Sequence, residues 1–183
     1  MKTPTRQILK LCLLSAVALA AVMTTGCRQD ESAPANAIRI KAGSTNKVTD
    51  ALGNEWLPDQ GFVGGQTYSV AGVEVTHTKV PELYTSERYS MTEFTRDLPN
   101  GKYRVKLMFA EVYSGITGPG GRVFSFSVQG HDFNDFDIWK KASGPNKACV
   151  VSVNVEVTDG KLDITFTPQE ENPKINAIEI IPR

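Results

Sequence analysis

The sequence predicts an all-β protein, an antiparallel β-sandwich or jelly roll, and three observations carry that prediction. Apolar and polar residues alternate in several short segments after residue 38. Residues that favour turns separate these segments. No helical periodicity of useful length interrupts them. Because each short strand has one apolar face, two sheets must pack together to bury those faces, and this gives a sandwich.

In five segments the apolar residues occupy every second position. These segments are Tyr103–Phe109, Phe124–Val128, Val151–Val157, Leu162–Thr167 and Ile178–Ile180. Between them, Pro99-Asn100-Gly101 and Asp159-Gly160 contain residues that tolerate positive φ, and they predict hairpin turns. Gly118-Pro119-Gly120-Gly121 predicts a longer loop. The segments are expected to form one domain over residues 38–183, without an internal repeat.

The composition is that of one ordinary globular domain, with 40% hydrophobic and 22% charged residues among 183. Twenty Lys and Arg balance twenty Asp and Glu, but no acidic residue occurs before Asp30. After residues 1–26 are set aside, 17 basic and 20 acidic side chains remain, a net charge of −3. Since nucleic-acid binding needs clustered Lys and Arg, a mildly acidic chain without basic runs is not expected to bind nucleic acid.

The first 26 residues resemble a secretory signal peptide. Three cations within the first ten residues precede an apolar run over Leu11–Met23. As a helix this run would reach only about 20 Å, short of the roughly 30 Å hydrocarbon core of a bilayer. The following Thr24-Thr25-Gly26-Cys27 resembles a bacterial lipobox, which implies that Cys27 becomes the N-terminus and carries acyl chains such as palmitate. Ordinary signal-peptidase cleavage, which would leave Cys27 as a free thiol, is the alternative.

Residues 27–37 are polar and contain Pro and Ala, so they predict a flexible tether behind the lipidated cysteine. Arg28 stands where lipoproteins retained at an inner membrane have Asp, which favours the outer membrane of a bacterial cell envelope. Cys149 is then the one remaining cysteine of the domain, so no internal disulfide is expected. It lies in an apolar, strand-like run, which indicates a small buried hydrophobe rather than a nucleophile.

Two motifs place tyrosines where a strand is expected to meet a loop, namely Leu83–Tyr89 and Phe109–Tyr113. A tyrosine ring offers a flat apolar face to the C–H face of a sugar, and its hydroxyl forms hydrogen bonds. Packing at strand edges is the alternative for these tyrosines. Glu87 and Arg88 stand beside Tyr89. They are expected to bind sugar hydroxyls or, as the match between guanidinium and carboxylate favours, to form an ion pair that fixes the loop.

The acidic cluster His131–Asp137 has oxygen atoms that suit Ca²⁺, but it lacks the spacing and the turn glycine of a calcium loop. It is interpreted as a polar loop that leads into a strand, with Phe133 and Phe136 as packing residues. No metal or other cofactor is therefore expected. His77 and His131 do not fit a catalytic spacing with Ser, Cys or Asp, so nucleophilic catalysis has no candidate.

These motifs resemble, in their order and spacing, a malectin domain, which is a carbohydrate-binding module. The resemblance covers nearly all of Ile38–Arg183. Its further motifs are Asn54-Glu55-Trp56, Gly64-Gly65 with Tyr68, Val123–Val128 before Gly130, Asp135–Trp139 and Asn172–Ala177. It implies a malectin-like, galactose-binding-like jelly roll whose loop end holds a di-glucose unit between aromatic rings, assisted by a carboxylate.

By position, the resemblance assigns ligand contacts to Tyr68, Tyr89 and Tyr113, and it assigns the carboxylate to Glu171. Two departures from the family concern the same site. Ser114 stands where malectin domains have a second loop aromatic, so one stacking surface is missing. Glu171 replaces an Asp and is one methylene longer.

The expected function is non-catalytic binding of an oligosaccharide or glycan, such as an α-glucoside, by a lipoprotein tethered to a membrane. A glycosidase is the first alternative, and it would need two carboxyl groups across the scissile bond. Glu87, Glu111 and Glu171 are its candidates. The second alternative is a protein-interaction module at the cell envelope, because one fold serves many functions.

Overall fold

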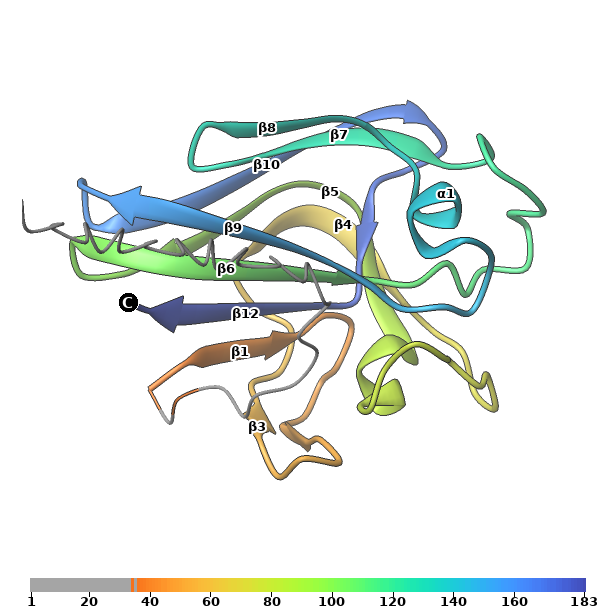
Figure 1. Ribbon diagram of the computed structural model, residues 1–183, viewed down its shortest axis with the longest axis horizontal. Helices are drawn as coiled ribbons and strands as arrows, with labels where there is room; N and C mark the ends of the chain where they lie inside the picture. The colour runs from red at the N-terminus through yellow and green to blue at the C-terminus, as the bar shows by residue number, and fades with distance from the viewer. Residues whose placement is uncertain (1–33, 35) are drawn as a thin grey trace, which may run out of the picture.

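The computed structural model describes residues 34 and 36–183, and this part of the chain is built mainly of antiparallel strands (Figure 1). The all-β prediction is therefore confirmed. The predicted signal peptide (residues 1–26), Cys27 and most of the predicted tether lie outside the described residues. Among the residues described, no helix is long and apolar enough to cross a membrane.

Four strands form the first sheet, in the order β1-β12-β6-β9, and every neighbouring pair is antiparallel. These strands are β1 (Ile38–Lys41), β12 (Ala177–Pro182), β6 (Gly101–Phe109) and β9 (Cys149–Val157). Because apolar and polar residues alternate along β6, Tyr103, Val105 and Leu107 point into the core, whereas Lys102 and Arg104 are exposed.

The second sheet has the order β11-β5-β10-β7-β8, and β4 pairs with β5 outside this path. Its strands are β4 (Phe62–Ser69), β5 (Ser86–Asp97), β7 (Val123–Val128), β8 (His131–Phe136), β10 (Lys161–Glu170) and β11 (Lys174–Ile175). Three short elements complete the fold. They are the pair β2 (Val48–Thr49) and β3 (Glu55–Trp56), the 3₁₀ helix η1 (Pro81–Tyr84) and the helix α1 (Ile138–Ala142).

Two hydrophobic clusters stabilise this arrangement. The larger one lies between the sheets and includes Phe94, Phe109, Phe124 and Ile178, all of them fully buried. A smaller cluster surrounds Trp56 and includes Met108 and Ala177, which lie on the face of the four-stranded sheet that points away from the main core. Both clusters consist of residues between 38 and 180, so this stretch contains its own core.

The two predicted hairpin turns are not hairpins. Pro99-Asn100-Gly101 connects β5 to β6, and Asp159-Gly160 connects β9 to β10, so each turn carries the chain from one sheet to the other. The turns are also bound to each other. Asn100 Oδ1 accepts from the Gly160 amide at 2.8 Å, and Asn100 Nδ2 donates to the Thr158 carbonyl at 2.9 Å.

The two-residue hairpin lies instead between β7 and β8, at Gln129 and Gly130, whose φ angles of 49° and 79° fit a type I′ turn. The strand that follows, His131–Phe136, corrects a second prediction, because the acidic cluster was expected to be a loop. The exposed polar residues alternate in part with Phe133 and Phe136, which pack on Phe126. Asp137 caps α1 by accepting from the Lys140 amide at 3.0 Å.

Candidate functional site

Strands β4 and β5 hold two of the predicted tyrosines on one face of the sheet. The register pairs Tyr68 with Glu87 and Gln66 with Tyr89, and residues that face each other across an antiparallel pair point to the same side. The Tyr89 hydroxyl donates to Gln66 Oε1 at 2.7 Å. Gln66 was not predicted from the sequence, and its amide NH₂ group has no hydrogen-bond partner among the residues that the structure describes.

Tyr113 comes from the loop after β6, and its ring contacts that of Tyr68. The two ring centroids are 6.0 Å apart and the ring planes meet at 85°, an edge-to-face arrangement. Tyr68 is 37% exposed and Tyr113 is 43% exposed. The structure therefore places two open aromatic rings at an angle to each other, beside the Tyr89–Gln66 pair.

A buried ion pair supports the Tyr113 loop from below. Arg122 Nε donates to Glu111 Oε2 at 2.7 Å, and Glu111 Oε1 accepts from the Tyr113 amide at 3.2 Å. Arg122 Nη1 also donates to the carbonyl of Asn172, in the turn between β10 and β11. Arg122 thus joins the two loops that carry Tyr113 and Glu171.

Glu171 lies in that turn with its side chain exposed and with a positive φ of 58°. The next residues fix the turn to β5, because the Ser90 amide donates to the Pro173 carbonyl at 2.9 Å and Lys174 pairs with Tyr89. The turn is therefore bound directly to the strand that carries Tyr89. Ser114 is exposed beside Tyr113.

Glu87 and Arg88 each form an ion pair, but not with each other. Because they are neighbours in β5, their side chains point to opposite faces. Glu87 accepts from the buried Lys174, whereas Arg88 donates to Asp59, with Nε to Oδ2 at 3.1 Å. The predicted Glu87–Arg88 pair is thus wrong in its partners, although both residues do fix the strand that carries Tyr89.

A second buried lysine lies close to Glu87. Lys41 Nζ donates to the Ser86 carbonyl at 3.0 Å, and the side chain is almost fully buried. Burial and, to a smaller extent, the positive charge of Lys174 lower the pKa of Lys41 to about 7, although the negative charge of Glu87 opposes the shift. Sequence reasoning missed both lysines, since they gain this role only when β1, β5 and β11 come together.

Two of the three carboxylates that were candidates for a glycosidase site are bound in ion pairs. Glu87 pairs with Lys174 and Glu111 pairs with Arg122, and the exposed fraction of each carboxylate side chain is 3% or less. Only Glu171 of the three is exposed. These contacts give Glu87 and Glu111 a structural role beneath the tyrosines.

Cys149 is half-buried against the main core, and burial raises the pKa of its thiol to about 12. Cys149 thus packs against the core as predicted, although it is half-buried rather than buried. Within residues 34 and 36–183, no three His, Cys, Asp or Glu side chains converge as a metal site would require.

Comparison with known families and proteins adds to this geometry. A family model described as "Malectin domain" matches residues 36–178. A probable LRR receptor-like serine/threonine-protein kinase of Arabidopsis thaliana is 35% identical over 122 residues, which are 55% of this chain and 12% of that protein. Receptor-like protein 4 of the same plant is 38% identical over 84 residues, 45% of this chain and 13% of that protein. The chain therefore spans only a small part of these relatives.

Solved structures share the fold. Bacteroides uniformis β-glucuronidase superimposes with a TM-score of 0.72 at 22% identity, covering 80% of this chain and 18% of that one. The ANXUR2 extracellular domain of Arabidopsis thaliana gives a TM-score of 0.67 at 16% identity, and the match covers 78% of this chain and 47% of that one. A chain in the complex of the plant peptide RALF23 with FER and LLG2 gives 0.67 at 19% identity, again covering 78% and 47%. At these identities the likeness concerns the fold alone.

Proposed function

Because the chain belongs to the malectin domain family, we propose that it is a non-catalytic module that binds glucose-containing oligosaccharides or glycans at its three tyrosines. The observation that carries this proposal is the Tyr68–Tyr113 pair, with both rings open to solvent and set edge to face. Rings at an angle present two apolar surfaces, on which the C–H faces of successive sugar units can stack.

Polar groups around the rings match the hydroxyl groups of such a ligand. The free NH₂ group of Gln66 donates, and the exposed Glu171 carboxylate accepts from two neighbouring hydroxyls at once. The site is open, so the affinity for a disaccharide is modest, at best about −0.3 kcal/mol per non-hydrogen atom. Copies tethered together would bind a polymer more tightly through avidity.

Calorimetric titration of residues 34–183 with maltose, nigerose and longer α-glucans tests the proposal. We expect binding in the wild type and a loss of about tenfold or more in Tyr68→Ala and Tyr89→Ala, equivalent to about 1.4 kcal/mol. Val63→Ala is the matched control, since it truncates another exposed side chain of β4 and should change the affinity less than twofold. No binding at millimolar ligand, or an affinity equal to that of the wild type in both tyrosine variants, would exclude this site.

The non-catalytic part of the proposal rests on the ion-paired carboxylates Glu87 and Glu111. Incubation with fluorescently labelled α- and β-linked oligosaccharides should release no product. Release that Glu171→Gln abolishes would instead identify a glycosidase.

Protein binding at the same face is the second candidate function. One related fold was solved in a complex with the peptide RALF23, and Ser114 removes an aromatic surface that sugar binding would use. A partner captured at this face and not displaced by α-glucans would favour it.

The proposal also includes an acylated Cys27 that holds the domain at a bacterial outer membrane, on the strength of the lipobox-like Thr24–Cys27. Metabolic labelling with radioactive palmitate should mark the wild type and leave Cys27→Ser unmarked. Cell fractionation should then find the labelled protein in the outer membrane. Equal labelling of the two proteins would rule out Cys27 as the site.

A further inference from the structure

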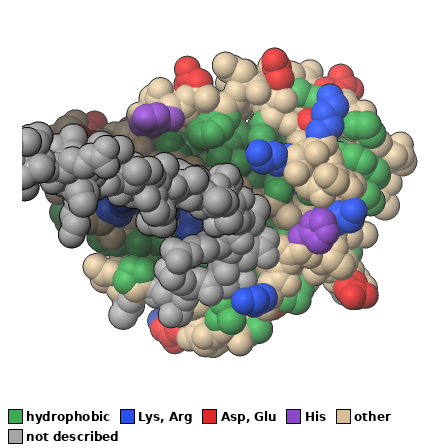
Figure 2. All heavy atoms as spheres, viewed as in Figure 1, with side chains coloured by type: hydrophobic (Ala, Val, Ile, Leu, Met, Phe, Trp, Pro, Cys, Tyr) green, Lys and Arg blue, Asp and Glu red, His purple; other side chains and the backbone are tan. Residues whose placement is uncertain are grey.

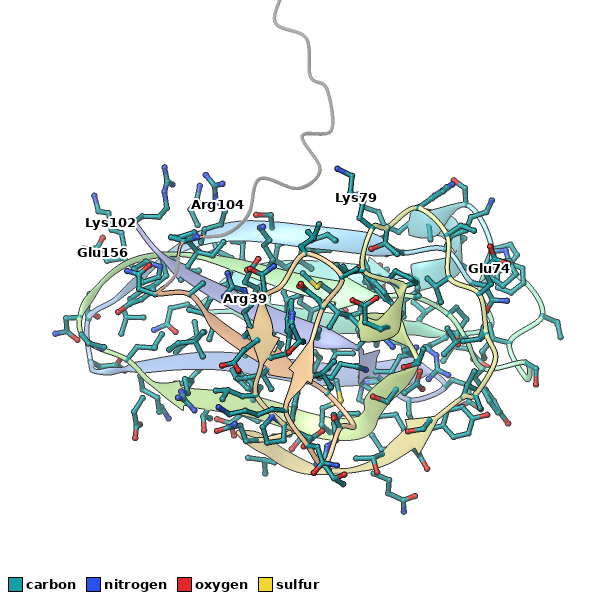
Figure 3. All side chains as sticks on the ribbon, turned by 90° about the horizontal axis from the view of Figure 1, so that it is seen from below. Arg39, Glu74, Lys79, Lys102, Arg104 and Glu156 are labelled. Atoms are coloured by element: carbon teal, nitrogen blue, oxygen red, sulfur yellow. The ribbon has the colours of Figure 1, made fainter. Side chains whose placement is uncertain are left out.

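The outer face of the four-stranded sheet carries a row of cations that the function proposed above does not use. Lys102, Arg104 and Lys106 occupy alternate positions of β6, so all three point away from the core. Arg183 follows β12 and adjoins them, since its amide donates to the Lys102 carbonyl at 2.9 Å. We call these four residues the basic face, and Figure 3 shows Lys102 and Arg104 pointing outward from the upper side of the molecule, near its left end.

Acidic side chains on this face are too few to neutralise it. Glu179 accepts from both Lys106, at 3.0 Å, and Arg39, at 2.8 Å, so a single carboxylate serves two cations. Glu156 lies opposite Lys102, whereas Arg104 faces the neutral Asn154. Within the described residues, Arg104 forms no ion pair.

The local charge runs against that of the whole domain. Residues 34–183 contain 16 Lys and Arg against 18 Asp and Glu, so the domain is negative as a whole. A negative domain is repelled from a negative surface unless its cations are gathered on one side. The five cations and two carboxylates named above give this side of the domain a net positive charge. A partner of complementary charge is an anionic surface.

The shape of the face favours many small anionic groups over one large ligand. The depression between Lys102, Arg183, His131 and Glu156 measures about 290 Å³, at the lower limit of small-molecule sites. In Figure 2, which views the molecule from this side, hydrophobic side chains on the right-hand part are interspersed with polar and charged ones. Because the basic face itself consists of Lys and Arg side chains, its contact with a surface would be electrostatic rather than an insertion of apolar side chains.

The position of the basic face agrees with a membrane below it. β1 is an edge strand of this sheet, and the eleven residues from Cys27 to Ala37 that precede it reach at most about 40 Å. Tyr113 follows the opposite end of β6, and the nine residues of that strand span about 30 Å. The tyrosines thus lie about 30 Å along the sheet from the start of the basic face.

We infer that the basic face docks on an anionic phospholipid surface. This lipid contact depends neither on the proposed sugar binding nor on the proposed anchor. A cation held near an anionic bilayer changes partitioning about fivefold, equivalent to roughly 1 kcal/mol. Removal of two such cations should therefore lower partitioning onto the bilayer about 25-fold.

Co-sedimentation of residues 34–183 with vesicles tests the inference without Cys27 and without a sugar. The vesicles contain phosphatidylcholine, either pure or with 30 mol% phosphatidylglycerol. We expect binding only to the anionic vesicles at 50 mM salt and loss of binding at 0.5 M, where charges are screened within a few ångströms. Lys102→Gln/Arg104→Gln should lower the partition coefficient about 25-fold, by the fivefold step per cation.

The matched control is Lys140→Gln/Lys141→Gln, which removes the same two charges from the exposed lysines of α1. It should change vesicle binding less than threefold. Equal losses in the two double variants, or no preference for anionic vesicles, would overturn the inference. Binding of soluble polyphosphate with the same dependence on Lys102 and Arg104, but no vesicle binding, would assign the face to an acidic polymer instead. Glucan titration of the same variants should be unchanged, which separates this inference from the proposed sugar site.

Discussion

Arg122 and Glu111 form a buried ion pair that links the two loops of the candidate site. Their Nε and Oε2 atoms are 2.7 Å apart, and the two side chains are only 5% and 1% exposed. The pair contacts both loops, since Glu111 also accepts from the Tyr113 amide and Arg122 donates to the Asn172 carbonyl. The position of Tyr113 relative to the Glu171 turn is thus set by one guanidinium.

Arg122→Met should destabilise the domain by about 3–5 kcal/mol, because it leaves the Glu111 carboxylate buried and unpaired. Urea unfolding followed by tryptophan fluorescence measures this change. The double variant Glu111→Leu/Arg122→Met should cost less than Arg122→Met alone, since it buries no charge. Costs that simply add in the double variant would show that the two side chains are not coupled.

Gly65 sets how closely β4 approaches β5 beside the site. A Cβ at this position would lie 2.3 Å from the Tyr89 carbonyl oxygen, whereas a Cβ at Gly64 would meet nothing within 4 Å. Both glycines have positive φ, 76° and 68°, so the backbone strain of an alanine is similar at the two positions.

Gly65→Ala should therefore lower the unfolding free energy clearly more than Gly64→Ala, whose cost is limited to about 1–2 kcal/mol of backbone strain. It should also weaken glucan binding, because the clash displaces Tyr89. Unfolding and glucan titration of the two variants, run in parallel, check this. Equal effects in both would mean that the close contact does not determine the site.

Ser114 offers a gain-of-function test. It is exposed directly after Tyr113, where the family resemblance implies an aromatic residue. Ser114→Tyr should restore a stacking surface worth about 0.5–1.5 kcal/mol, or roughly two- to tenfold in glucan affinity. Ser114→Leu, which is apolar but not aromatic, is the control and should gain less. An unchanged affinity in Ser114→Tyr would indicate that the ligand does not reach this loop.

The strands were predictable because burial of one face makes apolar residues recur at every second position, a pattern that each short segment shows by itself. Tyr103, Val105 and Leu107 are buried as their spacing predicts. The turns were not predictable to the same degree. Asn100-Gly101 and Asp159-Gly160 favour a reversal of the chain, but residue type does not decide whether the next strand pairs in the same sheet or crosses to the other.

The supporting groups of the site depend on contacts between segments far apart in the sequence. Glu87 binds Lys174, 87 positions away, and Arg88 binds Asp59, 29 positions away, whereas sequence proximity suggested that Glu87 and Arg88 pair with each other. The basic face was missed for a similar reason. Its cations alternate with core residues along β6, so no basic run appears in the sequence. The three tyrosines and Glu171 were assigned through family resemblance.

Lys41 connects stability to pH. Burial and the nearby Lys174 lower its pKa in the folded domain to about 7, while an unfolded lysine keeps the ordinary value near 10.5. Above pH 7 the unfolded state therefore binds more protons at this residue than the folded state, so the free energy of unfolding rises with pH. Cys149 has the opposite effect, but only at higher pH. Its raised pKa keeps the thiol protonated in the folded state while unfolded thiols ionise above about pH 8.5, so its contribution to the free energy of unfolding falls only above that pH.

Between pH 7 and 8.5 the wild-type domain should consequently gain about 1 kcal/mol of unfolding free energy per pH unit, the value for one proton released only in the folded state. Lys41→Met removes the titrating group and should flatten this slope, whatever its effect on absolute stability. Lys141→Met, at an exposed lysine of α1, serves as the control and should keep the wild-type slope. Urea unfolding at four pH values in this range measures all three proteins. A wild-type slope retained in Lys41→Met would show that Lys41 is not the group that releases the proton.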